Sequence, residues 1–267
     1  MNSFICFPNG KCKALTLSYD DGRIQDERLI DIFDRYGIRA TFNLSSGFLE
    51  KDFGNDMFNR VKKLYSNHEV ASHTCTHPTL ERCSMSMVTE EIMNDRRTLE
   101  KCLSEPVRGF AYPNGSYNDE IKKLLRQLDI AYARTTENDD SLNLPKDWYS
   151  WQPTCHHNDI DLMNKAKSFV EFNKRQYLKL MYVWGHSYEF ERDNNWQIIE
   201  EFCRYVGGRD DIWYCTNIEF HDYMEASRNL KFSADHSKVL NLSAITVYLN
   251  TENNDTVVIP PGVTGLP

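Results

Sequence analysis

The sequence lacks any apolar run that approaches the roughly 18 residues a membrane-spanning helix requires. Its N-terminus also lacks a basic start followed by a long apolar segment, so no signal peptide is predicted unless a leader has been trimmed away. Basic residues are in deficit, because 31 Lys and Arg stand against 39 Asp and Glu and the formal net charge is −8. These absences argue against nucleic acid and membrane partners, and they predict a cytoplasmic protein.

C-x-x-C pairs are absent as well, although the chain contains eight cysteines. Cysteines scattered in this way over 267 residues are typical of reduced thiols rather than of a disulfide framework. A disulfide or a metal site formed by Cys6 and Cys12 is the minor alternative.

The composition and the order of predicted elements indicate an α/β protein. With 40% hydrophobic and 12% aromatic residues, the chain can form a substantial core. Strand-like and helical segments alternate through residues 1–229, which is typical of βαβ units and a parallel sheet. About seven such units favour a (β/α) barrel over an open sheet. Strands are expected near 14–20, 38–44, 69–72, 107–112, 130–134, 148–151, 178–184 and 212–214, and helices near 26–36, 56–67, 86–103, 117–128, 161–172, 196–206 and 218–227.

The pattern changes at residue 230. The segments LSAITVYLN and TVVIPPGV alternate apolar and polar residues and are separated by the turn-rich TENND. We therefore expect a barrel domain over 1–229 and a small C-terminal β-hairpin extension over 230–267.

Polar clusters follow four of the expected strands, all at the same end. In a parallel α/β barrel, reactive groups gather where strands end and loops begin. We therefore expect these clusters to meet at one site. They are Asp20 with Asp21, His73 with His77, the segment YPNGSY at 112–117, and GHSYEF with His186.

His73 and His77 are four residues apart, so on a helical turn both imidazoles would face one way and could share a metal ion. Taken alone, such a pair is more often two unrelated histidines than a metal site. Together with an aspartate from another strand end, it suggests a site of two histidines and one carboxylate, with open positions for water and substrate. Zinc is the first choice for such ligands, and cobalt, nickel, iron and manganese also suit them.

The clusters carry a resemblance to a known family. SYDDG at 18–22 looks like the TFDDG motif of the polysaccharide deacetylase (NodB-homology) family of carbohydrate esterases, and HTCTH at 73–77 fits its H-[ST]-x-x-H motif. FAYPNG at 110–115 resembles the R-x-P-x-G motif, and the segment before His186 is similar to the final leucine-histidine motif. The resemblance spans about 14–187, with the motifs in the family's order.

The resemblance implies a distorted (β/α) barrel and metal-dependent removal of acetyl groups, N- or O-linked, from a carbohydrate. It implies that Asp21, His73 and His77 hold a divalent metal whose bound water attacks the acetyl carbonyl. Two adjacent carboxylates are both stable as anions only with a cation nearby, which fits this division of labour. A turn or helix-capping role for the two aspartates before Asp26 is the alternative.

The resemblance also implies the catalytic roles. Asp20 would be the general base, His186 the general acid, and the backbone N–H of Tyr112 would help to hold the oxyanion. The arginine of the third motif is missing, because Ala111 stands at its position. Arg134 is our candidate replacement as the partner of Asp20, with Arg108 second, and Asp147 is the expected orienting partner of His186.

Candidate substrate-binding residues come from the same loops. Aromatic side chains can stack on sugar rings, although they belong more often to the core. We expect Pro113, Trp148 and Trp184 to contact substrate; Trp151, Tyr112 and Tyr117 are further candidates, and His156 and His157 either line the pocket or lie in an exposed loop.

Two alternatives to a carbohydrate deacetylase remain open at this stage. One is a related C–N hydrolase that acts on a small amide or ureide, and the other is a non-catalytic carbohydrate-binding protein of the same fold. The intact Asp20, Asp21 and histidine set favours the deacetylase. A cytoplasmic enzyme would act on a short acetylated oligosaccharide or a precursor rather than on wall polymers.

Overall fold

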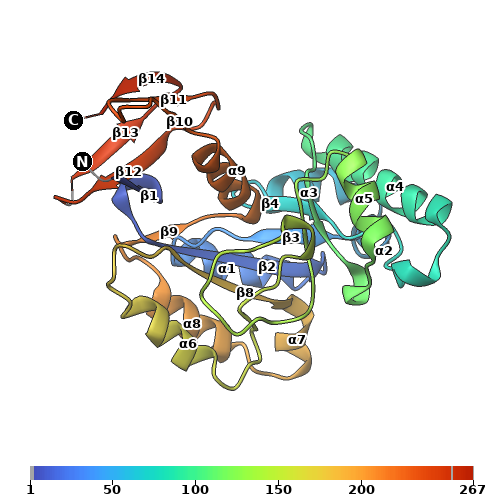
Figure 1. The fold of residues 1–267 in the computed structure, drawn as a ribbon. Helices are drawn as coiled ribbons and strands as arrows, with labels where there is room; N and C mark the ends of the chain where they lie inside the picture. Colours follow the sequence, from blue (N-terminus) through green and yellow to red (C-terminus); the bar gives the residue numbers. More distant parts are fainter. Residues whose placement is uncertain (1–2, 254, 267) are drawn as a thin grey trace.

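The computed structural model describes residues 3–253 and 255–266. Its central sheet is parallel throughout and runs in the order β6-β5-β4-β3-β2-β8-β7, and β9 pairs with the first residues of β2. The curled sheet confirms the predicted distorted barrel (Figure 1). Its strands are β2 Lys13–Asp21, β3 Thr41–Leu44, β4 Glu69–Ser72, β5 Gly109–Ala111, β6 Tyr132–Arg134, β7 Cys155–His156, β8 Lys179–His186 and β9 Ile212–Tyr214.

Helices cover the outside of the sheet. Most begin and end within a few residues of the predicted positions, but the helix expected at 56–67 is shorter and is preceded by a second one, α2. The helices are α1 Asp26–Arg35, α2 Ser46–Phe53, α3 Met57–Leu64, α4 Met85–Leu103, α5 Asp119–Gln127, α6 Leu162–Val170, α7 Ser187–Arg192, α8 Gln197–Val206 and α9 Asn217–Arg228. Among the described residues, no helix has the length and apolar character to cross a membrane.

The segment 148–151, which we expected to be a strand, forms a short 3-10 helix at Trp148–Ser150 instead. Only Trp151 reaches the sheet, through a parallel bridge to Arg134. The Asp147 side chain caps this turn by accepting a hydrogen bond from the Tyr149 backbone N–H. This local cap competes with strand formation, because it satisfies the backbone at the turn.

The centre of the molecule is β2, whose nine residues are all buried. Its side chains alternate between two environments, as strand geometry requires. Leu15, Leu17 and Tyr19 pack in the main apolar cluster with residues of α1 and α8. Thr16 and Ser18 instead join polar side chains, since Thr16 donates to Asn217 and Ser18 accepts from Asn43. The polar face leads directly to Asp20.

The C-terminal extension is larger than a single hairpin. The predicted hairpin is present as β12 Val247–Thr251 and β13 Thr256–Ile259, which pair antiparallel. The N-terminal strand β1 Ser3–Cys6 pairs with β12, so the extension holds both ends of the chain (Figure 1). A second small sheet is formed by β10 Lys231–Phe232, β11 Lys238–Asn241 and β14 Gly262–Gly265.

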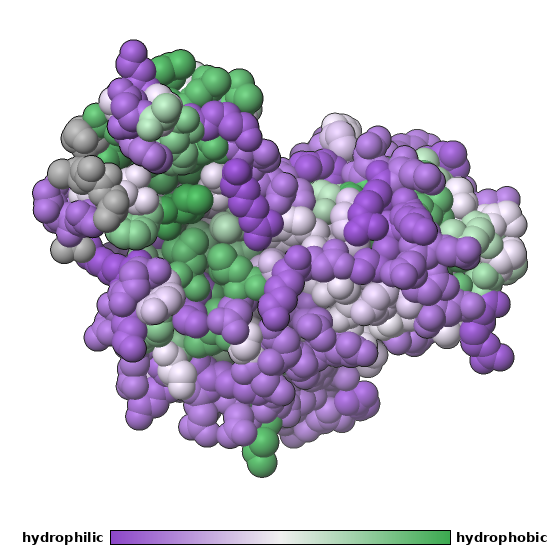
Figure 2. Space-filling model, in the orientation of Figure 1, coloured by the Kyte–Doolittle hydropathy of each residue, from purple (hydrophilic) through white to green (hydrophobic). Residues whose placement is uncertain are grey.

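Apolar side chains gather where the extension meets the barrel, on a face that is otherwise mostly polar (Figure 2). A hollow of about 390 Å³ at this junction is lined by aromatic and aliphatic residues that include Trp213, Ile218, Tyr223, Ile245 and Tyr248. Below it, Phe7, Phe220 and Leu249 belong to one buried cluster, which joins the extension to α9.

Gly185, near the end of β8, provides space for a buried imidazole. A Cβ at this position would lie 2.0 Å from Nδ1 of His157. The His157 ring is fully buried and stacks between Tyr19 and Phe190, with ring centroids 5.7 and 4.0 Å away, so it cannot move aside.

We therefore predict that Gly185→Ala lowers the free energy of unfolding by roughly 1–3 kcal/mol, the usual cost of overpacking a core. Urea denaturation monitored by circular dichroism measures the change. The matched control is Gly265→Ala, where an added Cβ meets nothing within 4 Å. Equal stabilities of the two variants would contradict the prediction.

Candidate metal and catalytic site

Three predicted ligands meet at the carboxyl ends of β2 and β4. Asp21 is the last residue of β2, and His73 follows β4 directly. The Oδ1 atom of Asp21 lies 3.7 Å from Nε2 of His73 and 3.8 Å from Nε2 of His77. The two histidines are not on a helical turn as expected, because Thr74 and His77 have positive φ angles of 66° and 57° in an irregular loop. The loop nevertheless directs both imidazoles to Asp21.

The protonation pattern of this cluster suits a metal ion. Nδ1 of His73 lies 2.9 Å from the Ala111 carbonyl, which can only accept a hydrogen bond, so Nδ1 carries the proton and Nε2 presents a lone pair. Burial lowers the pKa of His73 to about 3, so the ring is neutral. Oδ1 of Asp21 is buried and has no hydrogen-bond partner among the described residues. Two imidazoles and a carboxylate oxygen that has no hydrogen-bond partner among the described residues are a fitting donor set for a divalent transition metal.

Asp95 of α4 holds the loops that carry these ligands, and the sequence analysis did not identify it. Its carboxylate accepts hydrogen bonds from Ser72 Oγ at 2.6 Å, the Ser46 backbone N–H at 2.7 Å and the His73 backbone N–H at 3.3 Å. A single buried side chain therefore ties the end of β4 to the start of α2.

Asp20 forms a fully buried ion pair with Arg134, whose Nη2 atom contacts both carboxylate oxygens. Asn43 of the neighbouring strand donates a further hydrogen bond at 2.8 Å. Burial alone would raise the pKa of Asp20, but Arg134 and then His73 and His186 outweigh it and lower the pKa to about 2. Arg134 thus occupies the place expected for the missing motif arginine. The second candidate, Arg108, pairs with Asp222 instead.

The adjacent carboxylate behaves differently. Burial, and then the negative charge of Asp20, raise the pKa of Asp21. Arg134 neutralises Asp20, whereas Asp21 lies within ion-pair distance of the imidazoles of His73 and His77 among the described residues, so the site holds one compensated and one uncompensated carboxylate. A bound cation would supply the missing compensation.

His186 lies beside Asp20 because the two residues are paired in register on β8 and β2. Nε2 of His186 is 4.0 Å from Oδ2 of Asp20, and Nδ1 is 3.4 Å from Oε2 of Glu189. Burial would lower the pKa of His186, but Glu189 and then Asp20 and Asp21 outweigh it and raise the pKa. Glu189 is a second site residue that the sequence analysis missed. Its position three residues after His186, at the start of a helix, was the available signal.

Two predicted roles are corrected by the structure. The backbone N–H of Tyr112, expected to hold an oxyanion, donates a 3.0 Å hydrogen bond to the Arg134 carbonyl and is therefore occupied by pairing with the next strand. Asp147, expected to orient His186, binds Lys122 and caps the turn at Tyr149. The pKa of Asp147 is lowered, because Lys122 and these hydrogen bonds outweigh its partial burial.

The predicted substrate-binding residues separate into two groups. Trp184 lies at the site, with its ring centroid 5.8 Å from that of His186 and 4.6 Å from the Arg134 guanidinium. Trp148 is directed toward α9, where it donates to Glu225 at 2.8 Å, so its expected contact with substrate is not supported. Pro113 is buried in the turn after β5. Of the further candidates, Trp151 and Tyr112 are buried and Tyr117 stacks on Tyr112.

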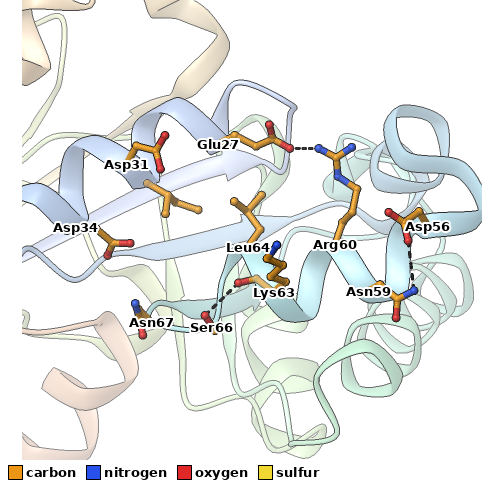
Figure 3. A pocket seen from close by; sticks show the side chains of 11 residues that line it. Glu27, Asp31, Asp34, Asp56, Asn59, Arg60, Lys63, Leu64, Ser66 and Asn67 are labelled. Carbon is orange, nitrogen blue, oxygen red and sulfur yellow. Dashed lines mark hydrogen bonds and ion pairs between the residues drawn. The ribbon is translucent and has the colours of Figure 1, made fainter.

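One hollow on the surface lies away from these residues. It measures about 540 Å³ and is situated between α1 and α3 (Figure 3). Two contacts join side chains of its lining, since Arg60 pairs with Glu27 and Asn59 donates to Asp56. We therefore assign no chemistry to it.

Comparisons with known proteins agree with this geometry. Residues 8–133 match the family model of polysaccharide deacetylases. A chitooligosaccharide deacetylase of Rhizobium leguminosarum bv. phaseoli is 28% identical over 151 residues, which cover 55% of this chain and 62% of that protein. The chain thus spans about three fifths of the length of the first curated relatives that it matches.

Solved structures share the fold. A crystal structure of a candidate polysaccharide deacetylase from Mycobacterium smegmatis has a TM-score of 0.62 at 17% identity and covers 84% of this chain and 94% of its own. A CE4 family pseudoenzyme from Bacillus anthracis has a TM-score of 0.52 at 18% identity and covers 82% and 68% of the two chains. Because this fold also occurs in a pseudoenzyme, catalysis has to be argued from the site residues.

The buried ion pair leads to a stability prediction. We expect Arg134→Met to lower the free energy of unfolding by roughly 3–5 kcal/mol at pH 7, because it leaves the Asp20 charge buried without a partner. In an Asp20→Asn background the same substitution should cost clearly less, and urea denaturation of the four proteins measures this coupling. Since the pKa of Asp20 is lowered, the stabilisation is present above its ordinary pKa of 3.8 and is lost as the pH falls through about 2.

The control for this cycle is Arg108→Met, which breaks a partly exposed ion pair with Asp222 and should cost about 1 kcal/mol or less. An equal cost of Arg134→Met with and without the Asp20 carboxylate would show that the pair is not the source of the stabilisation.

Proposed function

Because residues 8–133 of the chain belong to the polysaccharide deacetylase family, we propose that it is a metal-dependent hydrolase that removes N- or O-linked acetyl groups from a carbohydrate. One observation carries the proposal: an unpartnered Asp21 oxygen faces two imidazole nitrogens, immediately beside an aspartate held as an anion by Arg134. Metal-assisted hydrolysis of an acetyl group uses such a combination of a Lewis acid and a base.

Asp21, His73 and His77 would hold the metal, with zinc as the first choice and cobalt, nickel, iron or manganese as substitutes. When bound, the ion lowers the pKa of a coordinated water and polarises the acetyl carbonyl. The Ala111 carbonyl contributes by fixing the His73 tautomer, since it accepts a hydrogen bond from the Nδ1–H group and leaves the lone pair of Nε2 free.

Asp20 would accept the proton of the attacking water. Its Oδ2 atom lies 3.8 Å from Nε2 of His73 and 4.0 Å from Nε2 of His186, which places the carboxylate between the metal ligands and the second histidine. Arg134 keeps this carboxylate ionised at any working pH. The same ion pair makes Asp20 a weak base, so its contribution depends on its position next to the reacting water more than on its basicity.

His186 would donate a proton to the leaving amine or alcohol. Its pKa is raised, so the imidazolium form that can act as an acid persists to higher pH than in a free histidine. The Trp184 ring, whose centroid lies 5.8 Å from that of His186 in an edge-type arrangement, would pack against the sugar ring. From the named activity of the curated relatives, we propose chitooligosaccharides as the first substrates to test.

Metal binding is predicted to depend on Asp21. After chelation and reconstitution, we expect the wild-type protein to retain about one equivalent of zinc or cobalt per chain and Asp21→Asn to retain far less, because the variant loses the charged ligand. Metal content is measured by mass spectrometry after gel filtration. Asp31→Asn, on the exposed face of α1, is the control and should bind like the wild type. Equal metal retention by the two variants would contradict the proposed metal site.

Catalysis is predicted to depend on Asp20 with the metal still bound. We expect acetate release from a panel of N-acetylated chitooligosaccharides and O-acetylated sugars by the metal-loaded protein, and none after chelation. Asp20→Asn should keep the metal and lose about 10²–10⁴-fold in turnover, the usual contribution of a general base.

Full turnover by Asp20→Asn would show that the proposed mechanism is wrong. Metal binding without acetate release from any member of the panel would indicate a non-catalytic carbohydrate-binding protein. Turnover of small amides or ureides alone would indicate a related C–N hydrolase.

A further inference from the structure

A second cluster of titratable side chains lies next to the proposed site. Its centre is Oε2 of Glu189 on α7, which has Nε2 of His156 at 3.1 Å, Nε2 of His157 at 3.3 Å and Nδ1 of His186 at 3.4 Å. The backbone N–H of His186 also donates to this oxygen, at 3.4 Å. Several nitrogens therefore surround one carboxylate oxygen, which holds Glu189 as a fixed anion and lowers its pKa.

The composition of the cluster suggests a second metal site, but the hydrogen bonds of His156 argue against it. Nδ1 of His156 accepts a 3.1 Å hydrogen bond from the Asn158 backbone N–H, so this atom carries no proton in the neutral ring. The proton is then on Nε2, the atom that faces Glu189, and a protonated nitrogen cannot bind a metal. His73 has the opposite arrangement, with its proton on Nδ1 and its lone pair on Nε2.

We propose that Glu189 is a positioning residue for His186: it holds the Nδ1 side of the ring and so directs Nε2 toward Asp20 and the reacting groups. The inference rests on the function proposed above, in which His186 donates the proton. It also assigns to Glu189 the role expected for Asp147, whose carboxylate is engaged by Lys122.

The local fold makes Glu189 suited to this role. Glu189 is in the first turn of α7, and its side chain turns back to the residue that precedes the helix, His186 itself. Glu189 follows His186 by three residues and lies at the rigid start of a helix, so the distance between its carboxylate and the His186 ring is fixed. His156 of β7 contacts the Glu189 carboxylate through its Nε2 atom. The next residue, His157, occupies the space that a side chain at position 185 would fill.

The groups that face His186 are divided between its two ring nitrogens. Asp20 lies on the Nε2 side, at 4.0 Å, and Glu189 lies on the Nδ1 side, at 3.4 Å. Asp21, Tyr188 and His156 complete the titratable surroundings. Asp20 is already neutralised by Arg134, whereas the exposed Arg192 lies 3.7 Å from Oε1 of Glu189, so the other oxygen, Oε2, faces the imidazole and can stabilise its protonated form.

The test is Glu189→Gln, which keeps the shape of the side chain and removes its charge. In the metal-loaded enzyme we expect kcat to fall about 10- to 100-fold with KM little changed, since orientation of an acid affects the chemical step. The alkaline limb of the pH profile should move to lower pH, because the variant lacks the anion that raises the pKa of His186. Metal content should stay at the wild-type value.

A second measurement does not depend on turnover. Nuclear magnetic resonance of ¹⁵N-labelled imidazoles in the metal-free protein reports the tautomer and the titration of His186. We expect Glu189→Gln to lower its titration midpoint. Glu191→Gln on the same helix, whose carboxylate accepts from Trp196 rather than from an imidazole, should match the wild type in both experiments.

Unchanged kcat and an unchanged His186 titration in Glu189→Gln would overturn the proposal. So would a second metal equivalent in the wild type that is lost in this variant, because Glu189 would then be a metal ligand. Failure of the proposed function is distinguishable: the wild-type protein would release no acetate, whereas the spectrum of His186 would still respond to Glu189.

Discussion

The site depends on how two adjacent buried carboxylates are compensated. Asp20 and Asp21 approach the same imidazole nitrogen of His73, at 3.8 and 3.7 Å, although neighbouring residues of a strand should point to opposite faces. The exception arises at Asp21, whose φ of 80° ends the strand and turns its carboxylate back toward the ligands. Arg134 compensates Asp20, and Asp21 would be compensated by the metal proposed above. Two adjacent residues are thus assigned different roles, a fixed anion and a proposed metal ligand.

The histidines divide in the same way, and the partner of the second ring nitrogen decides the role of each. The Ala111 carbonyl accepts a hydrogen bond from Nδ1–H of His73 and leaves a lone pair on Nε2. A backbone N–H occupies Nδ1 of His156 and leaves a proton facing Glu189. His186 has a carboxylate near each nitrogen, which favours the doubly protonated ring of an acid. Residue type alone predicts none of these differences, because each depends on which groups the fold places beside the two ring nitrogens.

Sequence-based prediction is limited in the same way, by partners that only the tertiary structure determines. The expectation that polar residues at the strand ends lie close together was correct for five residues, Asp20, Asp21, His73, His77 and His186. Parallel strands bring their carboxyl ends to one edge of the sheet, independently of the loop conformations. The barrel and the terminal hairpin were predicted from periodicity. The failures concern groups whose partners are set by tertiary contacts: the Tyr112 N–H is used by strand pairing, Asp147 by Lys122 and Trp148 by Glu225. Pairing of β1 with β12 joins residues about 245 positions apart and left no local signal.

The displaced arginine shows how such a site can change without losing its charge balance. Ala111 and Arg134 are paired in register on adjacent parallel strands, so their side chains point to the same face at the same level. An arginine can therefore reach Asp20 from either strand, but both cannot fit, because Ala111 and Arg134 are fully buried. The small side chain of Ala111 is therefore needed to make room for Arg134, and it does not mean that the site has lost its arginine. A buried arginine must place its charge next to the carboxylate that it pairs with, and more than one strand of a barrel can carry that arginine.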